Sequence, residues 1–122
     1  MSADSHRWEE ALDHCRAAVA VFEDIGDVWS VAWACCTLGR GLLGSGRASD
    51  AAAQYRTAVE VFEGHDDADS RAVALLGLGE AHAALGEVEQ ARQAWGSALD
   101  CFTDHGDPRA EQVTERLRGL EA

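Results

Sequence analysis

The chain has 122 residues, of which 47% are hydrophobic and 26% charged, and its formal net charge is -12 at pH 7. This length fits one domain, and the composition is that of a folded chain rather than a disordered one. DNA, RNA and anionic membranes are bound through a cationic face, so the acidic balance argues against direct binding to any of them.

Apolar residues at helical spacing predict six helices in chain order. The first covers residues 7–25, where Trp8, Leu12, Cys15, Val19 and Phe22 share one face. Two more helices of this kind cover 51–62 and 91–102. A second kind of helix runs over 30–43, 70–85 and 109–120.

Residues at the helix boundaries support these bounds. Asp27, Asp67 and Asp107 each precede a helix of the second kind, where a carboxylate can accept the free N–H groups of the first turn. Gly46 and Gly86 fit turns that need a positive φ. Pro108, the one proline, falls at the first position of the last helix, which tolerates it.

The chain repeats itself with a period of 40 residues. Identical residues recur at five positions, and the aromatic, acidic and glycine columns are harder to attribute to chance than the alanine columns. These columns are Ala11/Ala51/Ala91, Ala18/Ala58/Ala98, Phe22/Phe62/Phe102, Asp27/Asp67/Asp107 and Gly39/Gly79/Gly119. One helical hairpin cannot cover its own apolar face, so stacked hairpins are expected to cover one another.

These residues resemble the tetratricopeptide repeat. One copy of its pattern is Leu75, Leu78-Gly79, His82, Ala91, Trp95 and Ala98, and the copy before it is Cys35, Leu38-Gly39, Leu42, Ala51, Tyr55 and Ala58. The resemblance implies an all-α solenoid of antiparallel hairpins with about six helices, in the order B, A-B, A-B, A. It divides the single domain 1–122 into a half repeat (7–25), two repeats (28–64 and 68–104) and a C-terminal capping helix (108–121).

The period exceeds the roughly 34 residues usual for the family. It is similar to the C-terminal arrays of actinobacterial transcriptional regulators of the SARP and STAND classes, and to repeats of kinesin light chains and polarity scaffolds. All ten basic residues are Arg, with no Lys or Asn, which is typical of a GC-rich genome and favours the actinobacterial comparison.

The order of the repeats predicts two different ends. Glu115 and Arg118 stand where Leu75 and Leu78 stand one repeat earlier, as expected of a capping helix. The first helix is a B helix without an A partner. We therefore expect either that the chain is a piece of a longer one or that its N-terminal end packs on another subunit.

The resemblance implies a non-catalytic protein–protein interaction module that binds a protein or peptide. Its A helices would line an inner face that suits an amphipathic helix or an extended apolar segment; alternatively, these side chains only close a narrow groove. The family's clamp for acidic peptides needs Lys and Asn, so it is not expected here. The predicted inner-face residues are Trp33, Cys36, Arg40, Leu43, Val73, Leu76, Glu80, Ala83, Val113 and Arg116.

Self-association is a second expectation, through an N-terminal edge formed by Trp8, Leu12, Cys15 and Val19, which would give a homodimer. Trp33 fits an interface anchor as well as a core residue, whereas Trp29 is expected to pack in the core or against a loop. A metal- or small-molecule-responsive sensor, or an accessory subunit of an enzyme, is the alternative function, motivated by Cys35-Cys36 beside Trp33.

Motifs for chemistry are not recognised. Cys35 and Cys36 are adjacent and lack the spacing of a zinc knuckle, and no histidine is paired convincingly with a cysteine. The acidic run 65–69 lacks the glycine and glutamate of a calcium loop. We predict no catalytic residue, metal or cofactor. No apolar run approaches the length of a membrane span and no secretory signal is recognised, so a cytoplasmic location with free thiols is expected.

Overall fold

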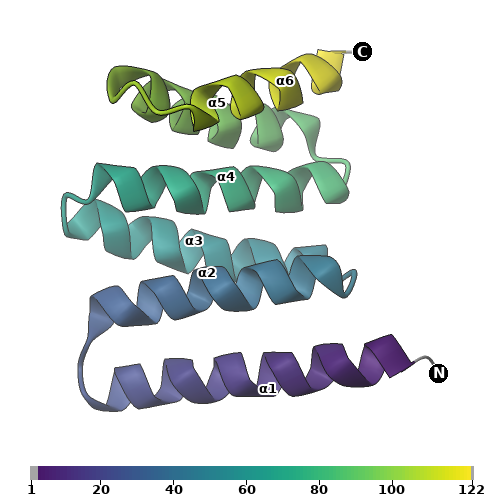
Figure 1. The fold of residues 1–122 in the computed structure, drawn as a ribbon, viewed down its shortest axis with the longest axis vertical. Coiled ribbons are helices and arrows are strands. Elements are labelled where there is room, and N and C mark those ends of the chain that lie inside the picture. The colour runs from purple at the N-terminus through teal and green to yellow at the C-terminus, as the bar shows by residue number, and fades with distance from the viewer. Residues whose placement is uncertain (1–2, 122) are drawn as a thin grey trace.

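The computed structural model describes the backbone of residues 3–121 and the side chains of residues 9–120. This part of the chain forms six helices and no strand. The helices stack in sequence order, each antiparallel to the next, and the termini lie at opposite ends of the stack (Figure 1). The predicted all-α helical-repeat fold is confirmed. The helices are α1 (Ala3–Asp24), α2 (Val28–Gly44), α3 (Ala48–Gly64), α4 (Ala68–Ala84), α5 (Val88–Asp104) and α6 (Arg109–Glu121).

The stack has two layers. In Figure 1, α2, α4 and α6 lie nearer the viewer, and α3 and α5 lie behind them. Each helix packs on its neighbours in sequence, and α2 also contacts α4 directly. Because α1 is the first helix of the stack, it packs on α2 and has no helix on its other side.

All five connections end the preceding helix in the same way. The N–H five residues on donates to a carbonyl in the last turn, as in Asp27 N to Phe22 O at 2.9 Å and Glu87 N to His82 O at 2.9 Å. This pattern is a Schellman motif, which needs one residue with positive φ. Gly26, Gly46, Gly86 and Gly106 supply it, but the α3–α4 connection uses Asp66 at φ 53°.

The predicted aspartate caps are confirmed. Oδ1 of Asp27 accepts the N–H of Ser30 at 3.1 Å, and Oδ1 of Asp67 accepts that of Ser70 at 3.1 Å. Asp107 accepts the N–H of Arg109 at 2.9 Å. These bonds satisfy N–H groups that the first turn of a helix leaves free.

Glycines in α2 and α4 let two aromatic side chains pass between the layers. The ring of Tyr55 lies between Gly39 and Gly77, where an added Cβ would come within 2.8 and 2.3 Å of it. Trp95 lies against Gly79 at 2.3 Å by the same measure, and its Nε1 donates to Leu76 O at 3.0 Å. The Leu-Gly motif is thus a packing requirement of the next B helix. Phe62 and Phe102 are 0% and 1% exposed and fill the core beside small alanines.

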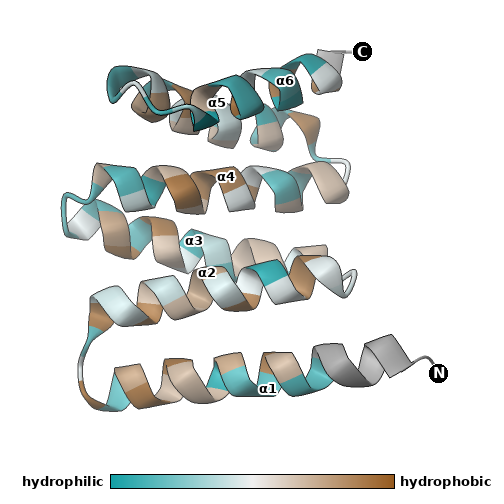
Figure 2. Ribbon diagram, in the orientation of Figure 1, coloured by the Kyte–Doolittle hydropathy of each residue, from teal (hydrophilic) through white to brown (hydrophobic). Residues whose placement is uncertain are grey.

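The C-terminal end is polar. Figure 2 shows α6 and the connection before it as the most hydrophilic part of the stack. Glu115 and Arg118 are exposed, whereas Leu75 and Leu78 at the matching positions of α4 are buried. The charged outer face of α6 is therefore already suited to water.

Candidate functional site

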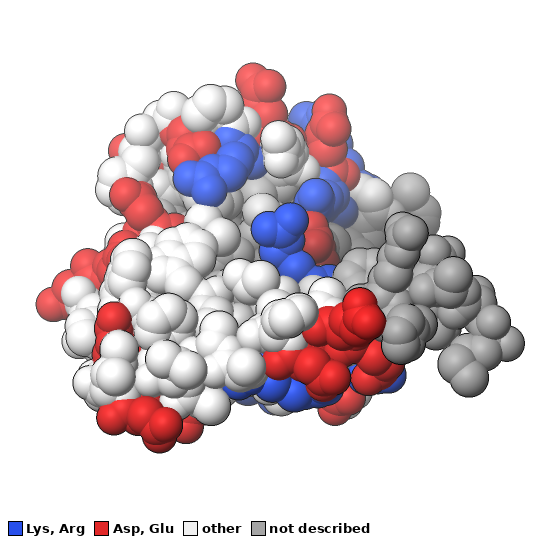
Figure 3. Space-filling view, turned by 60° about the horizontal axis from the view of Figure 1, so that its bottom comes forward, with Lys and Arg blue, Asp and Glu red and all other residues white. Residues whose placement is uncertain are grey.

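An open apolar groove lies along the free side of the α1–α2 pair. We call it the N-terminal groove. It encloses about 440 Å³ and exposes almost no polar surface. Figure 3 turns the α1 end forward and shows a broad uncharged area with both acidic groups and Arg side chains along its margin. The lining residues are Cys15, Ala18 and Phe22 from α1 and Trp29, Ser30, Trp33, Ala34 and Thr37 from α2.

The repeat shows why this groove exists. One repeat later, Phe62 takes the place of Phe22 and is covered by Trp33 and Trp29 of α2, with ring centroids 5.3 and 6.3 Å away. Phe62 is therefore fully buried, whereas Phe22 keeps partial contact with solvent. The N-terminal groove is the place that an A helix fills elsewhere in the stack.

The corner between α1 and α2 is apolar as well. Val21, Ile25, Val28 and Trp29 are 57%, 68%, 50% and 43% exposed, and they are four of the six exposed large hydrophobic residues in the described region. The residues that match Ile25 and Trp29 later in the chain are polar: His65 and His105, and Asp69 and Arg109. Exposed apolar residues that gather in one place mark an interaction surface.

Trp29 makes both a hydrogen bond and an aromatic contact. Its Nε1 donates to Oδ2 of Asp67 at 2.9 Å, and its ring packs edge-on against Trp33 at 5.9 Å. It therefore contacts the α3–α4 connection, which agrees with the expected loop packing, but at 43% exposure it is not a core residue, and its exposed edge lines the groove. Nε1 of Trp33 is buried and has no hydrogen-bond partner among the described residues.

A second, smaller groove lies between α2 and α4, and we call it the inner groove. Six of the ten predicted inner-face residues line it together: Trp33, Cys36, Arg40, Val73, Leu76 and Glu80. Thr37, Tyr55 and Gly77 complete a space of about 250 Å³. Glu80 also pairs with Arg116 of α6, which brings a seventh predicted residue beside it. Trp33 and Thr37 line both grooves, so the two are adjacent.

The other predicted inner-face residues lie elsewhere. Leu43 and Ala83 are half-buried and pack on the core. Val113 is 0% exposed, so the prediction that it lies on the binding surface is wrong: its position in α6 faces the core.

The predicted self-association edge needs a similar correction. Leu12 is 0% exposed and packs on α2, where an added Cβ on Gly41 would lie 3.1 Å from its Cδ2. Val19 is half-buried against the core, and Cys15 lines the N-terminal groove. The side chain of Trp8 lies outside the described residues.

Several residues that line the N-terminal groove were not predicted to do so. Ala18, Phe22, Ser30, Ala34 and Thr37 were read as core or not singled out. The repeat register contained the signal, because Ala58, Phe62 and Ala74 at the matching positions are buried.

Burial disfavours the charged forms of the Cys36 thiol and the Tyr55 phenol, which line the inner groove. It raises the pKa of Cys36 to about 12, with a smaller contribution from Cys35, and raises that of Tyr55 to about 12. The pKa of the Cys35 thiol is raised by burial too. A thiol with a raised pKa is a poor nucleophile, so these cysteines act as small apolar residues.

Comparison with protein families shows to which family the chain belongs. The tetratricopeptide repeat family matches residues 36–108, more than half of the chain. The protein therefore belongs to the tetratricopeptide repeat family, whose repeats generally mediate protein–protein interaction. No curated protein matches it. None of the helices in the described region is long and apolar enough to cross a membrane.

Proposed function

We propose that this chain is a protein-interaction module whose N-terminal groove binds an amphipathic helix of a partner protein. One observation carries the proposal: the groove lies against Phe22 of α1 where, one repeat later, α2 lies against Phe62 of α3. The partner helix would then supply two large apolar side chains four residues apart, as Trp29 and Trp33 do against Phe62.

The charge of the chain indicates which kind of partner helix it binds. The net charge is -12, and the uncharged area at the α1 end is bordered by acidic groups as well as by Arg side chains. Opposite charges at the rim speed association and disfavour wrong partners. The partner helix is therefore apolar on one face and basic on the flanks of that face. Its chain would continue over Trp33 and Thr37 into the inner groove, toward Arg40 and Glu80.

A helix from this protein is the natural probe. A synthetic peptide of residues 27–45, with Cys35→Ala and Cys36→Ala, carries the side chains that fill the matching place one repeat later. We expect titration calorimetry to show saturable binding with one peptide per chain. The reason is that an apolar helix face gains roughly 25 cal/mol for each Å² that it buries.

Ala34→Glu tests the location. Ala34 borders the groove, so the new carboxylate stays hydrated in the free protein but becomes buried and unpaired under a bound helix. We expect binding to be lost while the unfolding temperature stays near that of the parent. Ala53→Glu, at an exposed position of α3, is the matched control and should bind normally. Equal binding by both variants would show that the peptide binds outside the N-terminal groove. If the parent is a dimer that Ala34→Glu dissociates, the occupant of the groove is a second copy of the chain.

We propose further that the module serves a cytoplasmic regulatory protein of an actinobacterium. The Arg-only basic residues, the 40-residue period and the free cysteines support this proposal. The genomic sequence tests it: a GC-rich actinobacterial genome is the expected result, and an unrelated genome composition would count against it.

A further inference from the structure

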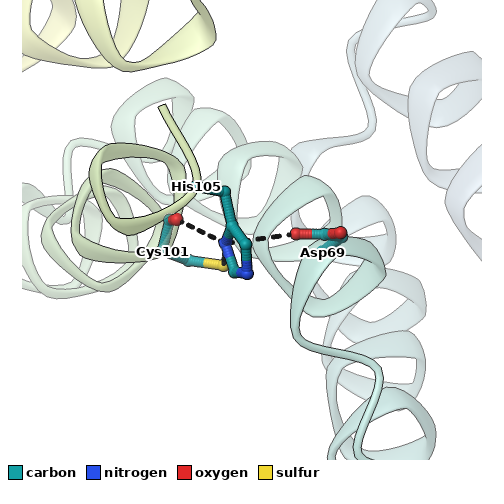
Figure 4. Close-up of side chains that lie close together, drawn as sticks. All are labelled: Asp69, Cys101 and His105. Atoms are coloured by element: carbon teal, nitrogen blue, oxygen red, sulfur yellow. Dashed lines mark hydrogen bonds and ion pairs between the residues drawn. The ribbon is translucent and has the colours of Figure 1, made fainter. Parts of the chain in front are cut away.

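Three side chains with metal-binding atoms meet where α4 begins and α5 ends. Cys101 and His105 lie four residues apart at the end of α5, and Asp69 lies in the first turn of α4. Figure 4 shows Cys101 and Asp69 on either side of the His105 imidazole. Nδ1 of His105 is 3.7 Å from Sγ of Cys101 and 3.4 Å from Oδ1 of Asp69. The sequence analysis paired no histidine with a cysteine, although four-residue spacing on one helix is a signal for such a pair.

The arrangement does not fit nucleophilic catalysis. In a Cys-His-Asp triad the thiol and the carboxylate contact opposite nitrogens of the imidazole, so that a proton can pass through the ring. Here both approach the same atom, Nδ1. The pKa of the Cys101 thiol is raised by partial burial and by the charge of Asp69, which opposes a free thiolate.

The same convergence fits a tetrahedral metal ion. Zinc binds sulfur at about 2.3 Å and nitrogen or oxygen at about 2.0–2.2 Å, so neighbouring ligand atoms stand roughly 3.3–3.6 Å apart. The nitrogen–oxygen distance of 3.4 Å lies in this range, and the sulfur–nitrogen distance of 3.7 Å is just above it. All three ligand atoms lie within 4.8 Å of one another, and rotation of the exposed Asp69 side chain can close the remaining edge.

The local charge also favours a cation. Asp69, Asp104 and Asp107 act on the Cys101 thiol, opposed by Arg71. Arg109 is close enough to feel Asp69 and Cys101, but its guanidinium is engaged with Asp107 at 2.6 Å. The field that discourages a free thiolate is therefore one that attracts a divalent cation.

We propose that Asp69, Cys101 and His105 form a three-ligand zinc site with water in the fourth position. A thiolate, an imidazole nitrogen and a carboxylate are the ligand types that zinc takes in proteins. On binding, the Cys101 thiol releases its proton to solvent. In the free protein Nδ1 of His105 donates to the carbonyl of Cys101 at 2.9 Å, so Nδ1 carries the ring proton. Metal binding through Nδ1 therefore breaks this hydrogen bond and moves the ring proton to Nε2. The site is independent of the N-terminal groove.

The preceding repeat lacks the site and supplies the control. Val61 and His65 stand at the positions of Cys101 and His105, and Trp29 stands at that of Asp69. His65 is exposed in the same turn of the matching helix but has neither a thiol nor a carboxylate at the matching positions.

Cobalt titration of the reduced, metal-free chain is the experiment. We expect one equivalent of Co²⁺ to give a sulfur-to-metal charge-transfer band in the near ultraviolet and tetrahedral d–d bands in the visible. Zn²⁺ should displace the cobalt and bleach both. Cys101→Ser should remove the charge-transfer band. His105→Ala should weaken Zn²⁺ binding at least about tenfold, because even residues that only orient a ligand contribute that much.

Cys15→Ser and His65→Ala should leave the spectrum and the affinity unchanged. Circular dichroism of each variant checks that the fold is intact. The proposal fails if the parent shows no charge-transfer band, or if His65→Ala weakens binding as much as His105→Ala does.

Discussion

At the scale of single residues, two helical glycines have opposite effects on packing. Gly79 lies in α4 against Trp95, and an added Cβ would come 2.3 Å from its Cδ1. Gly96 lies in α5 with no atom within 4 Å of such a Cβ. We predict that Gly79→Ala lowers the free energy of unfolding by about 1–3 kcal/mol through overpacking. Gly96→Ala should raise it by about 1 kcal/mol, because alanine favours helix. Urea unfolding of the two variants measures both changes in the free energy of unfolding. A higher free energy of unfolding for Gly79→Ala would show that the Trp95 side chain can move aside.

The sequence predicts that a glycine is needed at position 79, but not that Trp95 packs against it. The matching glycines Gly39 and Gly79 mark a special place in each A helix. Only the structure shows that an aromatic ring of the following B helix causes it. Gly77 shows the limit more clearly: it has no counterpart in the preceding repeat, yet Tyr55 approaches it as closely as Trp95 approaches Gly79. Such contacts depend on the angle between helices, which periodicity does not contain.

At the scale of helices, the three aspartate caps make stability depend on pH. Hydrogen bonds lower the pKa of Asp27, Asp67 and Asp107, and that of Asp107 falls to about 2, mainly through its bonds to Arg109. A group whose pKa is lower in the folded state stabilises the fold above its unfolded pKa. That contribution is lost as the pH falls through the folded pKa. We therefore predict that stability declines between about pH 4 and pH 2.

Asp107→Asn isolates one cap. Asparagine caps a helix about as well as aspartate but does not titrate in this range. Urea midpoints at pH 7 and pH 3 should therefore differ less for Asp107→Asn than for the parent. Asp100→Asn, at an exposed position of α5, is the matched control and should keep the parent's pH dependence. A parent with equal midpoints at the two pH values would contradict the prediction.

Helix boundaries were the part of the structure best foreseen from sequence. Asp27, Asp67, Gly46 and Gly86 take the roles that their chemistry predicts, because caps and turns depend on only a few neighbouring residues. Asp66 is the exception. It adopts the left-handed conformation where the other connections use glycine, and neither its charge nor its position in an acidic run indicates this.

At the scale of the whole molecule, the sequence predicts unequal ends but not the surface that results. The order of helices shows that α1 lacks an A partner, and the charges at Glu115 and Arg118 indicate a cap on α6. The location of the groove follows from packing: Leu12, predicted to lie on the free edge, instead faces α2, while Phe22 faces the open side. The rotation of α1 about its own axis decides which of the two side chains faces the open side. Only the contact of α1 with α2 fixes that rotation.

Adding the missing helix tests this account of the N-terminal end. In the proposed variant a copy of residues 28–47 replaces residues 1–7, which places it before Trp8 in the same register as α2 before α3. We predict that the copied Trp29 and Trp33 cover Phe22 as the originals cover Phe62. Burying one large apolar side chain contributes about 1.5–3 kcal/mol, so the free energy of unfolding should rise by at least about 2 kcal/mol.

The urea midpoint and slope measure this gain, because the slope grows with the surface exposed on unfolding. An extension whose copied helix carries Trp29→Asp and Trp33→Asp has the same length but cannot bury that face, so it should add little stability. The intact extension should also block the peptide of residues 27–45, since both occupy one groove. Equal stabilisation by the two extensions would show that the added helix does not enter the groove. If the intact extension stabilises the chain but the peptide still binds as tightly, then the peptide and the added helix occupy different sites.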